Sequence, residues 1–283
     1  MPDADGDPIV WLLGSNHAEH FFRTEWERSP LRVPAKSRGA AASDPPLFDR
    51  AALLALAPLP DSDDKATMRV VRVAESGKRE EPMSSGEDVA TCTKSGRSKL
   101  TRLATKTWLN KSLQQGFTVQ LFSPQQYSNK YSNRIAALIS SLEVRFGNLV
   151  GCSAYLTPPG CQGLAPHHDD VDVFIVQTQG EKRWKIYTPL ARLPREHSED
   201  LERDRLGKAV LDVTLKKGDV LYLPRGWVHE VRAFGGRAFA GRAFGGRAFW
   251  GGGAGGCGAQ RFAAIGSKRD EHGVNHQHGV ITR

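Results

Sequence analysis

Two short motifs contain the side chains of this sequence best suited to hold a metal. The first is His167-His168-Asp169, which follows a proline- and glycine-rich stretch and precedes an apolar segment. The second follows a Pro-Arg-Gly turn about sixty residues later and ends at His229. Two imidazoles and one carboxylate on neighbouring strands can cover one face of Fe(II) and leave three coordination positions open. Together the motifs predict a 2-His-1-carboxylate iron site.

The first motif contains two candidate H-x-D pairs. One pair is His167 with Asp169, and the other is His168 with Asp170. Residues two apart on a strand point to the same face, so either pair can turn towards a metal. Strand alternation therefore leaves both registers open.

The residues around these motifs resemble the iron-binding core of the JmjC-type ribosomal oxygenases, a family also described as bifunctional lysine demethylases and histidyl hydroxylases. The resemblance centres on SAYLTPPGCQGLAPHHDDVDVFIVQTQGEKRWKIYTP at 153–189 and includes KGDVLYLPRG at 217–226. It also includes FFRTEWERSPL near the start, and it runs from about residue 15 to about 231, weakly through 60–115 and strongly over 117–231. It implies a double-stranded β-helix, the jelly-roll or cupin fold of JmjC domains.

By this resemblance the metal is Fe(II), and its ligands are His167, Asp169 and His229. The family alignment and the spacing to a downstream lysine favour this register, which leaves His168 to pack at the strand edge. The implied cosubstrate is 2-oxoglutarate, and O₂ is the co-reactant. A keto acid that chelates iron at one end leaves a distal carboxylate that needs a charged partner. Lys182, fifteen residues after His167, stands at the family position for that partner, with an exposed strand lysine as the alternative.

Two more residues are assigned to the cosubstrate pocket by resemblance. Tyr155 stands where the family has a pocket tyrosine, and a tyrosine buried in the core is the alternative. Ser153 stands where the family has an asparagine. A hydroxyl offers one donor where an amide offers two, so this departure predicts a weaker hold on the cosubstrate.

Several neighbouring side chains have both a structural and a functional interpretation. Asp170 and Asp172 can bond a ligand imidazole or a basic substrate, or they are solvent-facing loop acids. Trp184 and Trp227 are expected in the core or the pocket wall. Arg225 is expected to be a turn residue with a surface salt bridge.

Short strands separated by glycine and proline, without long helices between them, predict a mainly β fold with flanking helices (α+β) built as a double-sheet barrel. Periodicity and end signals also predict helices, including a short one that ends before Pro30. The expected strands lie at 31–33, 117–122, 152–157, 171–178, 183–188, 210–215, 220–223 and 227–231, and the expected helices lie within 18–34, 47–57 and 124–146.

We expect three regions along the chain. Residues 1–116 form a helical or irregular N-terminal region, and 117–231 form the JmjC/cupin catalytic core. Within the first region, 59–116 is polar and reads as a solvated, mobile insertion, with a contact to RNA or ribosome as the alternative. That alternative depends on its basic residues, which are Lys94, Arg97, Lys99, Arg102, Lys106 and Lys111.

The third region, 232–283, is expected to be a disordered low-complexity tail. An Arg-Ala-Phe-Gly-Gly repeat of period five begins at Arg232, and ten of the residues 232–256 are glycine. So much glycine cannot offset its ordering entropy. An RGG-like RNA-binding segment is the functional alternative. The closing barrel strands, dimerisation helices and winged-helix domain that the family has after the second histidine are not evident, so the sequence indicates a truncated or frame-shifted chain.

Composition limits the remaining possibilities. The net charge of the 283 residues is +8, but 232–283 has eight basic and two acidic residues, so the remainder carries only +2. Nucleic-acid contact is therefore possible but not indicated for the core. The four cysteines lack zinc-type spacing and are expected to be reduced thiols of an intracellular protein. No signal peptide and no run approaching the ~20 apolar residues of a membrane span is present.

The predicted function is an Fe(II)- and 2-oxoglutarate-dependent protein oxygenase. By resemblance, its substrate is a histidyl side chain of a ribosomal protein or an N-methyl-lysine of a histone, and it acts in the nucleus or nucleolus. The family forms homodimers, but the region that dimerises is not evident here. A non-catalytic or truncated JmjC-like binding module is the main alternative, because open barrel edges would fail to hold His229. A cupin isomerase or small-molecule dioxygenase is a weaker alternative, since such an enzyme would be expected to have more histidine ligands at its metal.

Overall fold

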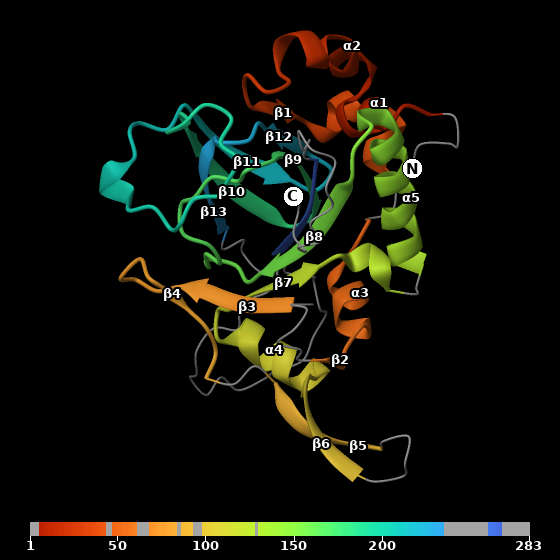
Figure 1. Cartoon of the computed structure of the whole chain (residues 1–283), viewed down its shortest axis with the longest axis vertical. Helices are drawn as coiled ribbons and strands as arrows, with labels where there is room; N and C mark the ends of the chain where they lie inside the picture. Colours follow the sequence, from red (N-terminus) through yellow and green to blue (C-terminus); the bar gives the residue numbers. More distant parts are fainter. Residues whose placement is uncertain are drawn as a thin grey trace, which may run out of the picture.

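Two antiparallel sheets face each other in the β-rich part of the chain, and helices cover the outer side of the larger sheet (Figure 1). The computed structural model describes residues 6–43, 47–60, 68–83, 86–92, 98–127, 130–234 and 260–267.

The larger sheet has eight strands in the order β1-β12-β9-β14-β8-β7-β3-β4. The smaller sheet has three strands in the order β11-β10-β13. Every pairing within the two sheets is antiparallel. The strands are β1 (Leu31–Val33), β3 (Met68–Val73), β4 (Arg79–Glu80), β7 (Thr118–Phe122), β8 (Val150–Thr157), β9 (Asp172–Gln179), β10 (Glu181–Tyr187), β11 (Leu211–Lys216), β12 (Val220–Leu223), β13 (Val228–Ala233) and β14 (Gln260–Ser267).

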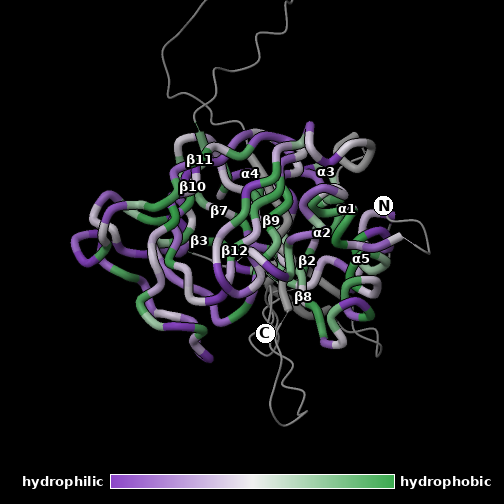
Figure 2. The backbone as a smooth tube through the Cα atoms, turned by 90° about the horizontal axis from the view of Figure 1, so that it is seen from above, coloured by the Kyte–Doolittle hydropathy of each residue, from purple (hydrophilic) through white to green (hydrophobic). Residues whose placement is uncertain are grey.

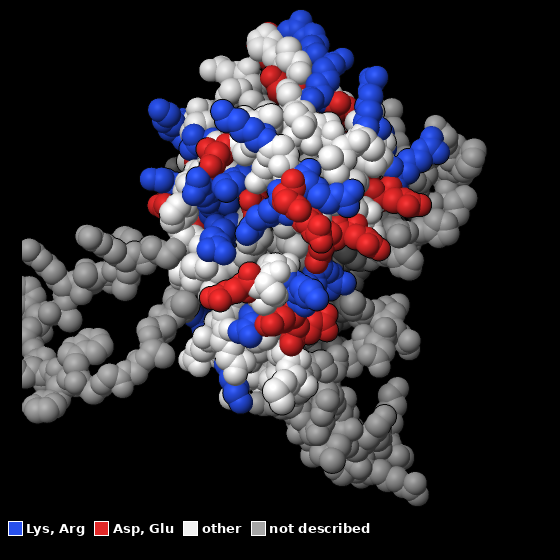
Figure 3. All heavy atoms as spheres, turned by 90° about the vertical axis from the view of Figure 1, so that its left-hand side faces the viewer, with Lys and Arg blue, Asp and Glu red and all other residues white. Residues whose placement is uncertain are grey.

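The space between the two sheets is filled by apolar side chains from both. Val173 and Ile175 of β9 pack in one cluster with Trp184 and Ile186 of β10. Along β10 the inward residues alternate with outward charged ones, as expected for a strand with one buried face. The outer face of the small sheet is charged, and Figure 3, which views this side, shows both signs interspersed.

The other face of the larger sheet packs against helices. Phe21 of helix α2 lies edge-on to Tyr222 of β12, with ring centroids 4.8 Å apart, and it also contacts Phe174 of β9. Strand β9 is therefore buried on both faces, and Figure 2 shows it as a largely green, hydrophobic strand in the interior. The helices are α1 (Pro8–Leu13), α2 (Ser15–Thr24), α3 (Arg50–Ala55), α4 (Lys106–Gln114) and α5 (Lys130–Phe146), and the 3-10 turns are η1 (Ala35–Ser43), η2 (Pro124–Gln126) and η3 (Arg203–Arg205).

The predicted mainly β jelly-roll with flanking helices is confirmed, and its strands and helices lie within a few residues of their expected positions. Residues 59–116 contain more regular structure than the sequence indicates. Strand β3 pairs with β7 inside the large sheet, with Val71 fully buried. A separate sheet of order β2-β6-β5 is formed by β2 (Leu59–Pro60), β5 (Glu87–Cys92) and β6 (Ser98–Ala104). Strands β5 and β6 are mainly polar and gain their structure from pairing, whereas the three valines of β3 (MRVVRV) do favour a strand and were missed.

The basic residues of this region are only partly described. Lys94 and Arg97 lie outside the described residues, whereas Lys106 and Lys111 are exposed on helix α4. The RNA alternative for this stretch therefore stays a prediction.

The C-terminal part differs from the expectation at one place. Residues 260–267 form strand β14, which pairs with both β8 and β9 and occupies the centre of the large sheet. A closing strand is thus present where the sequence indicated none, because a short QRFAAIGS segment gives a weak strand signal after so much glycine. The repeat at 235–256 lies outside the described residues. Among the helices of the described part, none is long and apolar enough to cross a membrane.

Candidate metal centre

The two motif histidines lie directly opposite each other on neighbouring segments of backbone. The amide of His229 donates to the carbonyl of His167 at 2.8 Å, and the reverse bond is 3.1 Å. The side chains of such a pair emerge on one face, and the two ring centroids are 4.5 Å apart. The backbone pairing thus explains how motifs about sixty residues apart reach one point.

Asp169 completes the group. Its Oδ1 lies 3.8 Å from His167 Nε2, and its Oδ2 lies 3.7 Å from His229 Nε2. One potential ligand atom from each of the three residues lies within 4.8 Å of the others. Within the part of the chain that the structure describes, this is the one such cluster of histidine, cysteine and acidic side chains.

A tight turn fixes the backbone of Asp169. The Gly226 amide donates to the Asp169 carbonyl at 2.9 Å. Gly226 has a φ of +88°, and a Cβ at this position would lie 2.5 Å from Pro194 Cδ. Only glycine meets both requirements without strain. The Pro-Arg-Gly turn of the second motif therefore positions the acid of the first.

The hydrogen bonds of both imidazoles leave Nε2 available for a metal. His167 Nδ1 lies 2.8 Å from the Ala165 carbonyl, and His229 Nδ1 lies 3.1 Å from the Trp227 carbonyl. A carbonyl only accepts, so each Nδ1 carries the proton and each Nε2 offers a lone pair. Burial, followed by the nearby His167, lowers the pKa of His229 to about 4, which keeps this ring neutral. The donor set fits a divalent transition metal.

The alternative register is separated from this group. The amide of His168 donates to Ser198 Oγ at 2.9 Å, and its Nε2 lies 3.3 Å from the Glu196 carbonyl. These contacts turn His168 towards the loop at 188–210. The geometry thus brings together His167 and Asp169, the pair that the resemblance favoured.

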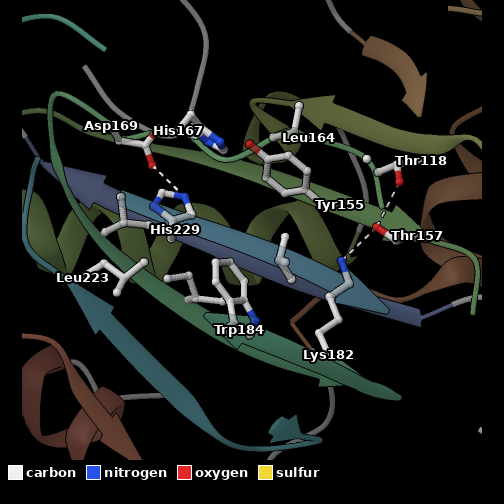
Figure 4. A pocket seen from close by; sticks show the side chains of 14 residues that line it. Thr118, Tyr155, Thr157, Leu164, His167, Asp169, Lys182, Trp184, Leu223 and His229 are labelled. Atoms are coloured by element: carbon white, nitrogen blue, oxygen red, sulfur yellow. Dashed lines mark hydrogen bonds and ion pairs between the residues drawn. The ribbon is translucent and has the colours of Figure 1, made fainter. Parts of the chain in front are cut away.

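A pocket extends from the three residues to a buried lysine (Figure 4). Lys182 is 1% exposed, and its Nζ donates to Thr157 Oγ1 at 3.0 Å. Thr118 Oγ1 donates to the same oxygen at 3.2 Å. Burial lowers the pKa of Lys182 well below its ordinary value. The interior position of this lysine excludes the exposed-strand alternative.

Tyr155 lies between the two ends of the pocket (Figure 4). Its hydroxyl accepts a bond from Gln120 Nε2 at 2.7 Å, and burial raises its pKa so that it stays protonated. Ser153 is fully buried on β8, but it is not among the described residues that line the pocket. Its predicted role towards a cosubstrate stays a prediction.

The two pocket threonines were missed by sequence reasoning. Thr157 is two residues from Tyr155 on the same strand face, so strand alternation alone could have placed it in the pocket. Thr118 lies on β7. Its side chain packs so closely against Gly163 that a Cβ at position 163 would lie only 2.5 Å from Thr118 Oγ1. Nothing in the local sequence marks Thr118, because threonine is common in strands.

Asp172 fits neither of its predicted interpretations, because it is only 3% exposed and its partner is a tyrosine and not a ligand imidazole. Its Oδ1 accepts a bond from Tyr222 OH at 2.5 Å, and the Glu27 amide donates to the same hydroxyl at 2.9 Å. Asp172 therefore holds the N-terminal region on the barrel. Arg225 lies 3.4 Å from Glu27 Oε1, in agreement with its predicted salt bridge.

Trp184 lines the pocket and is buried, as predicted. Trp227 packs, partly buried, against the cluster between the sheets. Both tryptophans therefore support the pocket wall and the core.

Comparisons with known proteins agree with this geometry. The JmjC domain model matches residues 120–244. The chain is 33% identical over 222 residues to the bifunctional lysine-specific demethylase and histidyl-hydroxylase NO66 of Drosophila persimilis, covering 78% of this chain and 29% of that protein. It is 35% identical over 223 residues to ribosomal oxygenase 1 of Gallus gallus, covering 78% and 33%.

The fold also matches a solved structure. The ribosomal oxygenase YcfD from Escherichia coli, in complex with cobalt and 2-oxoglutarate, superposes with a TM-score of 0.51 at 17% identity. The match covers 89% of this chain and 52% of that one. At this identity the likeness supports the double-sheet fold alone.

The match over residues 120–244 and the two-sheet fold identify a JmjC domain that carries the His-Asp-His group. Sequence similarity to the NO66 and ribosomal oxygenase proteins is more specific and supports a place in the JmjC ribosomal oxygenase family. It spans about a third of the length of these curated relatives.

Proposed function

We propose that this domain is an Fe(II)- and 2-oxoglutarate-dependent protein oxygenase. The observation that carries the proposal is the pocket with two unlike ends. At one end three metal-type donors converge, and at the other end a fully buried lysine is held by a threonine hydroxyl. A dicarboxylic keto acid is a ligand whose two ends need these two environments.

In this proposal His167, Asp169 and His229 hold the iron through Nε2, carboxylate oxygen and Nε2. Lys182 receives the distal carboxylate, because a buried cation is stabilised by an anion that shares its low-dielectric site. The protonated hydroxyl of Tyr155 points into the same space and can donate to a bound carboxylate. When bound, iron and 2-oxoglutarate supply the activation of dioxygen that hydroxylates a C–H bond.

The substrate class follows from the names of the relatives. They are called histidyl-hydroxylase, lysine-specific demethylase and ribosomal oxygenase. We therefore propose a histidyl side chain of a ribosomal protein as the substrate, with an N-methyl-lysine of a histone as the second candidate. A nuclear or nucleolar location belongs to the same proposal and depends on the resemblance alone.

The test is anaerobic visible absorption of the full chain after addition of Fe(II) and 2-oxoglutarate. We expect a charge-transfer band from chelated iron in the wild type. His229→Ala removes a ligand and should abolish the band, and Lys182→Ala should weaken it at limiting 2-oxoglutarate. His168→Ala is the matched control and should keep the band.

Two results would contradict the proposal. A folded wild-type chain without the band has no functional centre of this kind. A band lost in His168→Ala but kept in His167→Ala means that the other H-x-D register binds the metal.

A further inference from the structure

The segments that carry the two histidines contain an irregularity beside the metal group. Between the His167–His229 pair and the next backbone contact, at Ala233, residues 162–166 lie opposite residues 230–232. Five residues thus face three, which is a large β-bulge. Bulges redirect side chains and occur beside active sites. Because some backbone hydrogen bonds between the two segments are missing at a bulge, other contacts must hold the segments in place.

Arg203 crosses this bulge from outside the pocket. Its Nε and Nη2 donate to Glu230 Oε2 at 2.9 and 2.7 Å, and Nη2 also donates to Gln162 Oε1 at 2.9 Å. Gln162 Nε2 in turn donates to the carbonyl of Leu164, a pocket residue, at 2.9 Å. One guanidinium therefore joins the loop before His167 to the residue directly after His229.

The partners of Arg203 are well fixed. Glu230 is 7% exposed and Gln162 is 4% exposed. The second carboxylate oxygen of Glu230 accepts a bond from Tyr187 OH at 2.8 Å. A buried carboxylate and amide keep their orientation when their hydrogen bonds are satisfied, and the planar fork of arginine adds directional restraint.

We propose that Arg203 is a positioning residue for the metal centre. By holding Gln162 and Glu230 at a set separation, it sets the spacing of His167 and His229 without touching either ring. The inference depends on the proposed metal site and extends it by giving a role to the loop at 188–210, which carries Arg203.

A Co(II) titration of the full chain tests this with the metal alone, by visible d–d absorption and without cosubstrate or substrate. Arg203→Met should weaken Co(II) binding about tenfold and change the band shape, because lost outer-shell support typically weakens metal binding 10–100-fold. Gln162→Met keeps the Arg203–Glu230 pair and should give a smaller change of the same kind. Arg205→Met, in the same 3-10 turn, is the matched control and should resemble the wild type.

The outcomes separate this inference from the proposed function. Identical Co(II) affinity and spectra in Arg203→Met and wild type overturn the positioning role. A lower melting midpoint with an unchanged Co(II) spectrum also overturns it, since Arg203 would then be purely structural. A wild-type chain that binds no Co(II) overturns the proposed metal centre itself, and this inference with it.

Discussion

The two ends of the pocket are built in different ways. At the metal end, His167 and Asp169 lie on an irregular segment and His229 lies at the start of β13, directly after the turn at Gly226, and backbone hydrogen bonds hold these segments together. The opposite end uses Thr118, Thr157 and Lys182, which lie within regular strands. The first end therefore depends on turn geometry. The second depends on a cation that is buried among paired strands. A substitution at one end should therefore affect that end and leave the other unchanged.

The largest expected effect comes from removing β14, a central strand of the large sheet. Deletion of 260–283 takes away β14, which pairs with β8 and β9 along their lengths. Two open edges in the centre of the sheet expose unpaired backbone groups, so we expect loss of cooperative thermal unfolding and of metal binding. Differential scanning calorimetry and Co(II) absorption measure both.

Deletion of 268–283, which keeps β14, is the control. A shorter chain ending at 259 that unfolds cooperatively with the wild-type midpoint would show that β14 is dispensable.

The metal end alone should respond to Gly226→Ala. The positive φ and the 2.5 Å approach to Pro194 Cδ force the turn to shift, which costs on the order of 1–3 kcal/mol of folding free energy. The Asp169 carbonyl loses its fixed partner, so Co(II) affinity should fall at least tenfold while the lysine end stays intact. Urea unfolding measures the change in folding free energy, and Co(II) titration measures the change in metal affinity.

Gly207→Ala, where a Cβ meets open space, is the matched control. Wild-type metal affinity in Gly226→Ala would mean that the turn does not position Asp169.

These two ends also differ in how far the sequence predicts them. The metal end was predicted because its donors lie in two contiguous motifs that end in identifiable turns. At the other end only Lys182 was predicted, through the resemblance. Thr118 and Thr157 come together with Lys182 only when their strands pair, so their local sequence does not mark them. The same reason explains β14, whose partners β8 and β9 lie far away in the sequence.

The lysine end should show opposite effects on stability and binding. Lys182→Met replaces a buried cation, whose pKa burial lowers, by an apolar chain of similar length. We expect the chain without cosubstrate to gain about 1 kcal/mol of stability, since it no longer buries an ammonium group. Affinity for 2-oxoglutarate, measured by the charge-transfer band, should fall roughly 100-fold as the charged partner is lost.

Lys185→Met, on the outer face of the same strand, is the control and should change neither quantity in this way. A destabilised Lys182→Met with unchanged cosubstrate affinity would contradict the proposed role of this end.

The effect confined to one narrow pH range concerns two acids three residues apart that face opposite sides of the barrel. Asp169 faces the pocket, whereas Asp172 begins β9 on the face of Phe174, against the helices. Alternation along β9 explains why Asp172 is not a pocket residue. Burial raises the pKa of Asp172 from 3.8 to about 6, although the hydrogen bond from Tyr222 opposes this.

The sign of the pH dependence follows from the raised pKa. The folded chain binds a proton at Asp172 more tightly than the unfolded chain does, so this group favours folding most at low pH. Its contribution falls as the pH rises from about 4 to about 6 and then stays constant, and a shift of about two pKa units corresponds to a change of at most about 3 kcal/mol. Asp172→Asn should flatten the unfolding free energy over this window, while Asp204→Asn in the exposed turn η3 should not. Equal slopes in Asp172→Asn and wild type would mean that Asp172 titrates alike in the folded and unfolded chain.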